Sequence, residues 1–355
     1  MEQLSLQIFD TDKFKKNNTS IKESISLLTL NQYDIYSVSL SGGKDSVACL
    51  LHLLELGVDK RKIEIVHQKI DGGPTDEEFM DWPVTESYCE ALAEYFNIPI
   101  FHQWREGGIL GELMRKDSLT NDVCFEVANE KGEKRIIRLE TTRGKKSTRL
   151  KFPAMSASLQ SRWCSSSAKI DPYRRTLNND PKYLNKKVLV ITGERREESS
   201  NRSKYAEAEF HTCNSGKKLV HSWRPIIDWS EEQVWDIIKR WNIQPHPAYM
   251  LGWSRTSCFG CIFSSPDHWA MMRHISDERF NKLAAKETEI NHTIHNGMTL
   301  PEKADKGTLD LLPTGEELKF WKEKALNKNF TVDDIVTDNW TLPRGAFRGC
   351  SGGPV

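Results

Sequence analysis

The chain has 355 residues, of which 38% are hydrophobic and 28% charged, which is enough apolar material for one large domain or two ordinary ones. Its formal net charge is zero, which excludes a global field that would draw it onto nucleic acid or a membrane. No apolar run approaches the length of a transmembrane helix.

The start of the chain, Met1-Glu2-Gln3-Leu4-Ser5, lacks the basic and apolar stretches of a signal peptide. We therefore expect a cytoplasmic protein that contacts no membrane. In that reducing compartment the eight cysteines are expected to be core residues, metal ligands or nucleophiles, and not disulfides.

Strand and helix patterns alternate after a polar lead-in over residues 1–30. The expected strands are 35–40, 63–66, 98–101 and 188–191. The expected helices are one with an apolar face over 47–54 that stops near Gly57, one that starts near Thr85, and one with an apolar face over 234–241. This order predicts an α/β fold with a doubly wound parallel sheet, whose ligands bind at the carboxyl ends of the strands. Residues 251–355 are expected to form a smaller, mostly helical region that contains cysteines.

The most informative segment is Ser41-Gly42-Gly43-Lys44-Asp45-Ser46, which joins the first expected strand to the first helix. A glycine turn before a helix presents free backbone N–H groups and the positive end of the helix dipole, an arrangement that binds phosphate. It is not a Walker A loop, because Val38 stands where that pattern requires glycine and Asp45 follows the lysine. Lys44 can place a positive charge against phosphates, and Ser41 and Ser46 can donate hydrogen bonds. Asp45 either holds Mg²⁺ or orients Lys44.

The SGGKDS segment resembles the PP-loop of ATP pyrophosphatases, and three later segments resemble the phosphoadenosine phosphosulfate (PAPS) reductase family. They are Arg162-Trp163-Cys164 with Lys169-Ile170-Asp171-Pro172, then Gly193-Glu194-Arg195-Arg196-Glu197-Glu198-Ser199, and finally Arg224-Pro225-Ile226-Ile227-Asp228-Trp229 with Val234-Trp235 and Pro247-x-Tyr249. DNA phosphorothioation ATP pyrophosphatases share this family. The resemblance implies a HUP-type fold and a nucleotide site formed by Ser39, Ser41, Gly42, Gly43, Lys44, Asp45, Ser46, Asp71, Gly193 and Arg195.

Two of these residues have alternative interpretations. Asp71 follows the second expected strand and either touches ribose or metal, or serves the turn at Gly72-Gly73. Arg195 either clamps phosphate in bidentate geometry or forms an ion pair with Glu197 or Glu198.

Three cysteines predict a metal or cluster site. Cys258-x-x-Cys261 has the ligand spacing of an iron–sulfur cluster or zinc, and Cys164 lies in the Arg-Trp-Cys segment. The family's cluster-bearing reductases carry two adjacent cysteines there, whereas Trp163 fills the first position in this chain. The fourth ligand is then Cys350 or Cys213, or a [4Fe–4S] cluster keeps one open iron, or the site holds zinc with His268 nearby. The alternative is that Cys258 and Cys261 are small apolar residues in a helix turn.

Cys350 lies in Arg348-Gly349-Cys350-Ser351, near the end of the chain. Sulfonucleotide reductases carry their nucleophile in a Glu-Cys-Gly-x-His segment, from which this chain departs at every position but the cysteine. Cys350 is therefore a ligand, a nucleophile, a sulfur carrier or an inert residue.

Residues 105–160 are polar and irregular and are expected to be an insertion or a mobile segment. Within them, residues 131–151 hold nine basic side chains: Lys131, Lys134, Arg135, Arg138, Arg143, Lys145, Lys146, Arg149 and Lys151. This stripe suits a phosphate backbone such as DNA, or a protein partner, and the alternative is a solvated hairpin.

Taken together, these features predict an ATP pyrophosphatase that forms AMP and pyrophosphate and activates an acceptor for sulfur transfer, with DNA phosphorothioation as the best match. The predicted catalytic residues are Lys44, Asp45, Arg195 and Cys350, the predicted metal or cluster ligands are Cys164, Cys258, Cys261 and Cys350, and the expected cofactors are ATP, Mg²⁺ and a [4Fe–4S] cluster. The expected partners are the nucleotide, DNA, and a cysteine desulfurase or another sulfur-transfer protein. The alternatives are a sulfonucleotide reductase that uses Cys350 and a non-catalytic nucleotide-binding subunit of a sulfur-transfer or defence complex. The nucleotide-binding domain is expected to span residues 31–250.

Overall fold

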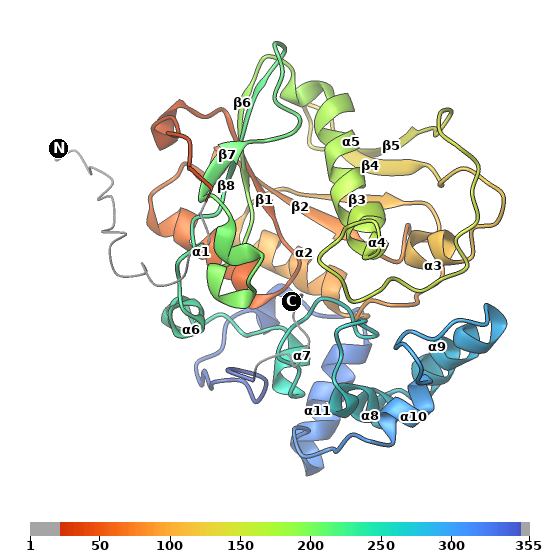
Figure 1. The fold of residues 1–355 in the computed structure, drawn as a ribbon. Helices are drawn as coiled ribbons and strands as arrows, with labels where there is room; N and C mark the ends of the chain where they lie inside the picture. Colours follow the sequence, from red (N-terminus) through yellow and green to blue (C-terminus); the bar gives the residue numbers. More distant parts are fainter. Residues whose placement is uncertain (1–21, 349–355) are drawn as a thin grey trace.

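A computed structural model describes residues 22–348, and its centre is an eight-stranded sheet in the order β5-β4-β3-β2-β1-β6-β8-β7 (Figure 1). The strands are β1 (Ile35–Ser39), β2 (Ile63–Lys69), β3 (Ile100–Arg105), β4 (Val123–Ala128), β5 (Lys134–Leu139), β6 (Lys187–Ile191), β7 (Ala208–Phe210) and β8 (Leu219–Trp223). The five central strands, from β3 to β8, are parallel, and the flanking strands β4, β5 and β7 are antiparallel.

Helices cover both faces of this sheet, as the doubly wound prediction requires. They are α1 (Lys44–Glu55), α2 (Thr85–Phe96), α3 (Gly108–Leu113), α4 (Trp163–Ser165), α5 (Asp171–Asn179), α6 (Glu231–Arg240), α7 (Pro247–Met250), α8 (Pro266–Ile275), α9 (Asp277–Glu289), α10 (Leu300–Ala304) and α11 (Gly315–Leu326). Along β6, Leu189 and Ile191 pack into the larger hydrophobic cluster, which includes α1 and α2 residues. Val188 and Val190 pack into a second cluster with α5 residues. This alternation follows from the two-residue period of a strand that is buried on both sides.

The structure corrects one expectation and decides between two alternatives for another. The third strand begins at Ile100 and not at Ile98, because Pro99 has no N–H to donate to the neighbouring strand. The carbonyl of Pro99 still accepts the N–H of Ile65. The expected insertion at 105–160 contains the β4–β5 hairpin, which extends the sheet beyond β3. The hairpin agrees with the alternative interpretation of its basic residues.

Helices α8 to α11 gather below the sheet in Figure 1, on the side where α7 also lies. Their buried residues, such as Trp269 and Phe280, belong to the same hydrophobic cluster as Val38 of β1 and Leu50 of α1. The proposed division at residue 250 therefore crosses one continuous core, and it stays a prediction. None of the described helices is both long and apolar enough to cross a membrane.

Candidate nucleotide site and cysteine cluster

The PP-loop leaves the carboxyl end of β1 and enters α1 at Lys44. Gly42 has a φ of 73°, and a Cβ there would lie 3.2 Å from the ring of His246 and 3.3 Å from that of Tyr88. Only glycine meets both conditions without strain. The hydroxyl of Ser46 accepts the N–H of Ser41 at 3.2 Å and donates to the carbonyl of Gly43 at 2.8 Å, so Ser46 closes the loop on itself.

Lys44 is the buried cation of this loop, with 8% of its side chain exposed. Its Nζ lies 3.2 Å from Asp45 Oδ2 and 3.9 Å from Glu231 Oε1, and its backbone N–H donates to the hydroxyl of Tyr249 at 3.0 Å. Burial acts to lower the pKa of Lys44, but the neighbouring carboxylate of Asp45 outweighs it, with Tyr249 and Glu231 acting in the same direction, so the pKa is raised. Lys44 is therefore held as a charged group at the helix N-terminus.

Arg195 reaches the same carboxylate from the loop after β6. Its Nε lies 2.6 Å from Asp45 Oδ1, and its Nη1 lies 2.6 Å from Glu197 Oε2 and 3.1 Å from the carbonyl of Trp229. The pKa of Asp45 is lowered, because Lys44 and Arg195 together outweigh the effect of its burial. Each oxygen of Asp45 takes one of these contacts, an arrangement that matches orientation of Lys44, and a contact of Asp45 with Mg²⁺ stays a prediction.

Gly193 makes the meeting of these two loops possible. A Cβ at this position would lie 2.8 Å from the carbonyl carbon of Asp45 and 3.1 Å from the N of Ser46, both of which are backbone atoms that cannot rotate away. The predicted convergence of the PP-loop and the Gly193 turn is thus present in the structure. Ser39 lies half-buried at the end of β1, beneath the loop.

Asp71 follows β2, the neighbouring strand, but its carboxylate turns into its own loop. Its oxygens accept the backbone N–H groups of Phe79, Met80 and Asp81 at 2.9 Å. Burial raises its pKa, against the effect of these three hydrogen bonds. The arrangement agrees with the turn interpretation of Asp71, and a contact with nucleotide stays a prediction.

Sequence reasoning did not identify Asp81, Glu231 and Thr256 as site residues. Burial raises the pKa of Asp81 to about 7, with the Asp71 carboxylate acting in the same direction. Glu231 opens α6, whose capping box with Ser230 marks a helix start and gives no sign of a contact with Lys44. The hydroxyl of Thr256 would lie 3.0 Å from a Cβ at Gly43, a proximity that no sequence motif indicates.

The structure brings Cys164, Cys258 and Cys261 to one place. Cys258 hydrogen-bonds Cys261, and this bond lowers the pKa of Cys261 to about 6, with Arg255 and Lys169 acting in the same direction. The same bond raises the pKa of Cys258. Cys164 is close enough to Cys261 to interact with it electrostatically, while burial raises its pKa. Three soft sulfur donors around Lys169 suit an iron–sulfur cluster or zinc.

Among the described residues, these three sulfurs are not part of a group whose ligand atoms all lie within 4.8 Å of one another. The hydrogen bond between Cys258 and Cys261 keeps two of the sulfurs close together, and the choice between zinc and an iron–sulfur cluster stays a prediction. The ring of His268 stacks on Trp253 and its Nδ1 accepts the N–H of Ser265, and a role of His268 beside zinc stays a prediction.

Of the two cysteines predicted as a fourth ligand, Cys213 lies within the described residues and Cys350 lies outside them. Cys213 lies in the second hydrophobic cluster, beyond the sheet, and its Sγ donates to the carbonyl of Arg174 at 3.6 Å. Cys261 belongs to the first cluster, so Cys213 does not lie where it could bind the same metal or cluster as Cys261. Cys350 lies outside the described residues, and its predicted roles stay predictions.

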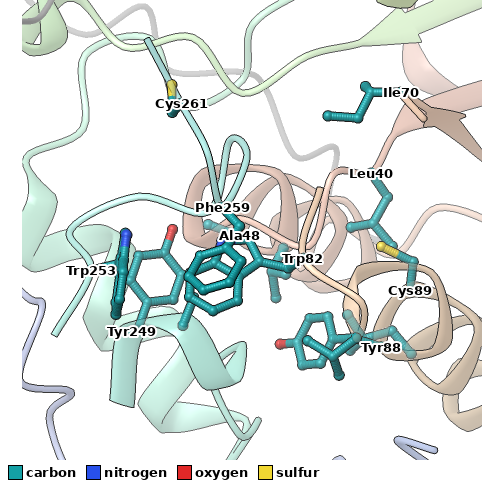
Figure 2. Close-up of a cluster of buried hydrophobic side chains, with 14 of the residues drawn as sticks. Leu40, Ala48, Ile70, Trp82, Tyr88, Cys89, Tyr249, Trp253, Phe259 and Cys261 are labelled. Atoms are coloured by element: carbon teal, nitrogen blue, oxygen red, sulfur yellow. The ribbon is translucent and has the colours of Figure 1, made fainter. Parts of the chain in front are cut away.

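Aromatic packing fixes the Cys258–Cys261 turn against the PP-loop side of the protein. Figure 2 shows Trp82 and Phe259 stacked, with ring centroids 4.0 Å apart, and Trp253 and Tyr249 beside them. Trp253 meets Trp82 edge to face at 4.9 Å. Since the hydroxyl of Tyr249 accepts the N–H of Lys44, one rigid cluster connects both candidate sites.

The basic segment is partly neutralised within the protein. Lys134 pairs with Glu126, Arg149 with Glu112, and Arg138 with Glu106 and Asp122. Arg149 also lies over the ring of Trp163, 4.5 Å from its centroid. Residues 148–163 and α9–α10 enclose an open groove of about 1350 Å³, lined by Arg149, Lys151, Trp163, Asn291 and His292 among others.

Comparisons with known proteins agree with the resemblance. The model of the phosphoadenosine phosphosulfate reductase domain matches residues 121–264, which include the Arg-Trp-Cys, Gly193 and Cys258–Cys261 segments but not the PP-loop. An uncharacterized 37.8 kDa protein of Escherichia phage 186 is 32% identical over 163 residues, which cover 44% of this chain and 47% of that protein. An uncharacterized protein of Methanocaldococcus jannaschii is 30% identical over 121 residues, covering 34% and 28%.

Enzymes of known name are also among the relatives. The adenosine 5′-phosphosulfate reductase of Allochromatium vinosum is 26% identical over 98 residues, which cover 28% of this chain and 34% of that enzyme. The chain thus spans less than half the length of each of these three relatives. Residues 121–264 thus match the phosphoadenosine phosphosulfate reductase domain, and this match, the fold and the four segments in order support the PAPS reductase / PP-loop family for this chain.

Proposed function

We propose that this protein is an ATP pyrophosphatase that activates an acceptor for sulfur transfer. The observation that carries the proposal is the buried, charged Lys44 at the N-terminus of α1, held by Asp45 next to Arg195. The glycine turn, the dipole of α1 and this lysine together suit the triphosphate of a nucleotide.

The chemistry is adenylyl transfer. An oxygen of the acceptor attacks the α-phosphorus, the bond from that phosphorus to the oxygen bridging to the β-phosphorus breaks, and pyrophosphate leaves. A sulfur nucleophile then displaces AMP, and the acceptor oxygen departs on AMP. Lys44 stabilises the charge that builds on the leaving pyrophosphate. Mg²⁺, when bound, would supply further neutralisation of the phosphate charge, and Asp45 is the residue of this loop that could hold it.

DNA is the proposed acceptor, and phosphorothioation the proposed outcome. The groove beside Trp163 offers Arg149 and Lys151 to a phosphate backbone, and it adjoins the short helix that carries Cys164. Arg143, Lys145 and Lys146 lie exposed in the segment that leads to it. A cysteine desulfurase or another sulfur-transfer protein is the proposed source of the sulfur.

The deciding experiment measures pyrophosphate release from ATP in the presence and absence of the proposed acceptor. The protein with Mg²⁺ is given ATP, with and without duplex DNA and a cysteine desulfurase, and pyrophosphate is quantified. We expect ATP-dependent pyrophosphate release that increases with the acceptor. ATP binding without turnover under all conditions contradicts the proposal and favours a non-catalytic nucleotide-binding subunit.

The second candidate function is a sulfonucleotide reductase, because relatives such as that of Allochromatium vinosum carry this name and a cysteine stands late in this chain. It is tested with adenosine 5′-phosphosulfate or PAPS and reduced thioredoxin. Sulfite release that a Cys350→Ser variant loses, without pyrophosphate release from ATP, replaces the first proposal with this one.

The proposed cofactor of the cysteine cluster is a [4Fe–4S] cluster held by Cys164, Cys258 and Cys261. We expect anaerobically purified protein to be brown and to contain about four iron atoms per chain. Cys258→Ser should lose most of the iron, whereas Cys213→Ser, in the other hydrophobic cluster, should retain it. Colourless wild-type protein that contains zinc and no iron contradicts the cluster.

A further inference from the structure

A second group of metal-ligating side chains lies between α2, β3 and β4, apart from the PP-loop and the cysteines. Glu86 and Glu90 stand one helical turn apart on α2, and His102 faces them from β3. One ligand atom from each of the three lies within 4.8 Å of the other two. The glutamates are partly exposed, with 36% and 50% of their side chains accessible, whereas His102 is 3% exposed.

Glu126 of β4 holds the His102 ring through Nδ1. Its Oε2 lies 3.0 Å from Nδ1 and also accepts the backbone N–H of His102 at 2.9 Å. Lys134 lies 3.1 Å from the same oxygen. This geometry suits the tautomer with the ring hydrogen on Nδ1 and Glu126 as its acceptor, as for histidines that ligate a metal through the other nitrogen.

In that tautomer the other ring nitrogen, Nε2, carries a lone pair. It is buried, and it has no hydrogen-bond partner among the described residues. It points at two further acceptors, since Glu90 Oε1 lies 3.6 Å away and Glu86 Oε1 lies 4.0 Å away. Facing acceptors of this kind are unfavourable unless a cation lies near them, and Lys69 contacts only Glu86 among the three.

We infer that His102, Glu86 and Glu90 bind a divalent transition-metal ion through Nε2 and one carboxylate oxygen from each glutamate. One imidazole and two carboxylates form a donor set that zinc and manganese accept, and the half-exposed Glu90 leaves a side open to water. Glu126 acts on the metal indirectly, as the carboxylate that orients a ligating histidine.

Lys69 is the competing cation. Its Nζ lies 2.7 Å from Glu86 Oε1, so a metal ion must share or displace this contact. The carboxylates of Glu86, Glu90 and Glu126 carry one negative charge more than Lys69 and Lys134 together can neutralise. A proton on Nε2 of His102 would balance this charge, as a metal ion would. The test therefore has to separate a metal site from a simple imidazolium.

The test titrates nucleotide-free protein with Mn²⁺, followed by the electron paramagnetic resonance of free Mn²⁺, and with Zn²⁺ by calorimetry. Because Glu90 is half-exposed, Glu90→Gln should fold as wild type does while it weakens one metal site at least tenfold. Glu94→Gln, one turn further along α2 and exposed, should bind as wild type does. Lys69→Met should tighten binding severalfold, since it removes the competing charge.

Zinc held by the cysteines is common to wild type and Glu90→Gln, so it cancels in the comparison. The inference is overturned if neither metal gives a site that Glu90→Gln weakens, which is the result that an imidazolium at His102 predicts. Because the measurement uses neither ATP nor turnover, its outcome is independent of the proposed function.

Discussion

Replacing Lys44 by methionine is expected to lower the rate of pyrophosphate release from ATP by about 10²–10³-fold, the usual cost of removing one charge-stabilising donor. Methionine preserves the packing of the buried stem and removes only the ammonium group. Asp45 keeps its ion pair with Arg195, so the loop has little reason to unfold. The measurement is kcat for pyrophosphate release under saturating ATP.

The matched control is Lys60→Met, a lysine exposed in the turn before β2, which should react at the wild-type rate. Thermal melting should show that Lys44→Met remains folded. If that variant is folded and keeps more than a third of the wild-type rate, Lys44 is not the cation that stabilises the leaving pyrophosphate, and the proposed reaction loses its main support.

The sequence was sufficient where one contiguous segment carries the structure. Ser41 to Ser46 predicted the strand, the turn and the helix, because apolar runs lie on either side of the glycines. The meeting of Gly193 with Asp45 was also predictable, since parallel strands place their carboxyl ends at one edge of the sheet.

Tertiary contacts determined what the sequence did not reveal. The β4–β5 hairpin was only the alternative interpretation, because it carries charged side chains along an edge strand and Lys134 to Leu139 show little of the alternation that identifies a strand. His102 and Glu86 meet only through the pairing of α2 with the sheet, which no local pattern specifies. Likewise, the sequence suggested that Arg195 either clamps phosphate or pairs with a carboxylate, and only the structure shows its contact with Asp45.

Replacing Arg195 by methionine is expected to cost about 3–5 kcal/mol of unfolding free energy, because it removes one partner of a buried ion pair. Arg195 is 3% exposed and contacts Asp45, Glu197 and the carbonyl of Trp229, and all three acceptors would lose a donor. The measurement is urea unfolding of the nucleotide-free protein, followed by tryptophan fluorescence and checked by circular dichroism.

Arg240→Met is the matched control, since Arg240 makes a bidentate contact with Glu55 at 3.0 Å but its side chain is 56% exposed. An exposed pair contributes about 0–1 kcal/mol, so this variant should be close to wild type. Adding Asp45→Asn to Arg195→Met should recover part of the lost stability, because the unpaired carboxylate is then neutral. Two results would contradict this account. In the first, Arg195→Met lowers the free energy of unfolding no more than Arg240→Met does. In the second, Asp45→Asn lowers it further in the double variant by as much as it does in the wild-type protein. In either case Arg195 does not stabilise the loop through Asp45. Its buried charge would then be retained for a ligand, which is the phosphate clamp that the sequence suggested.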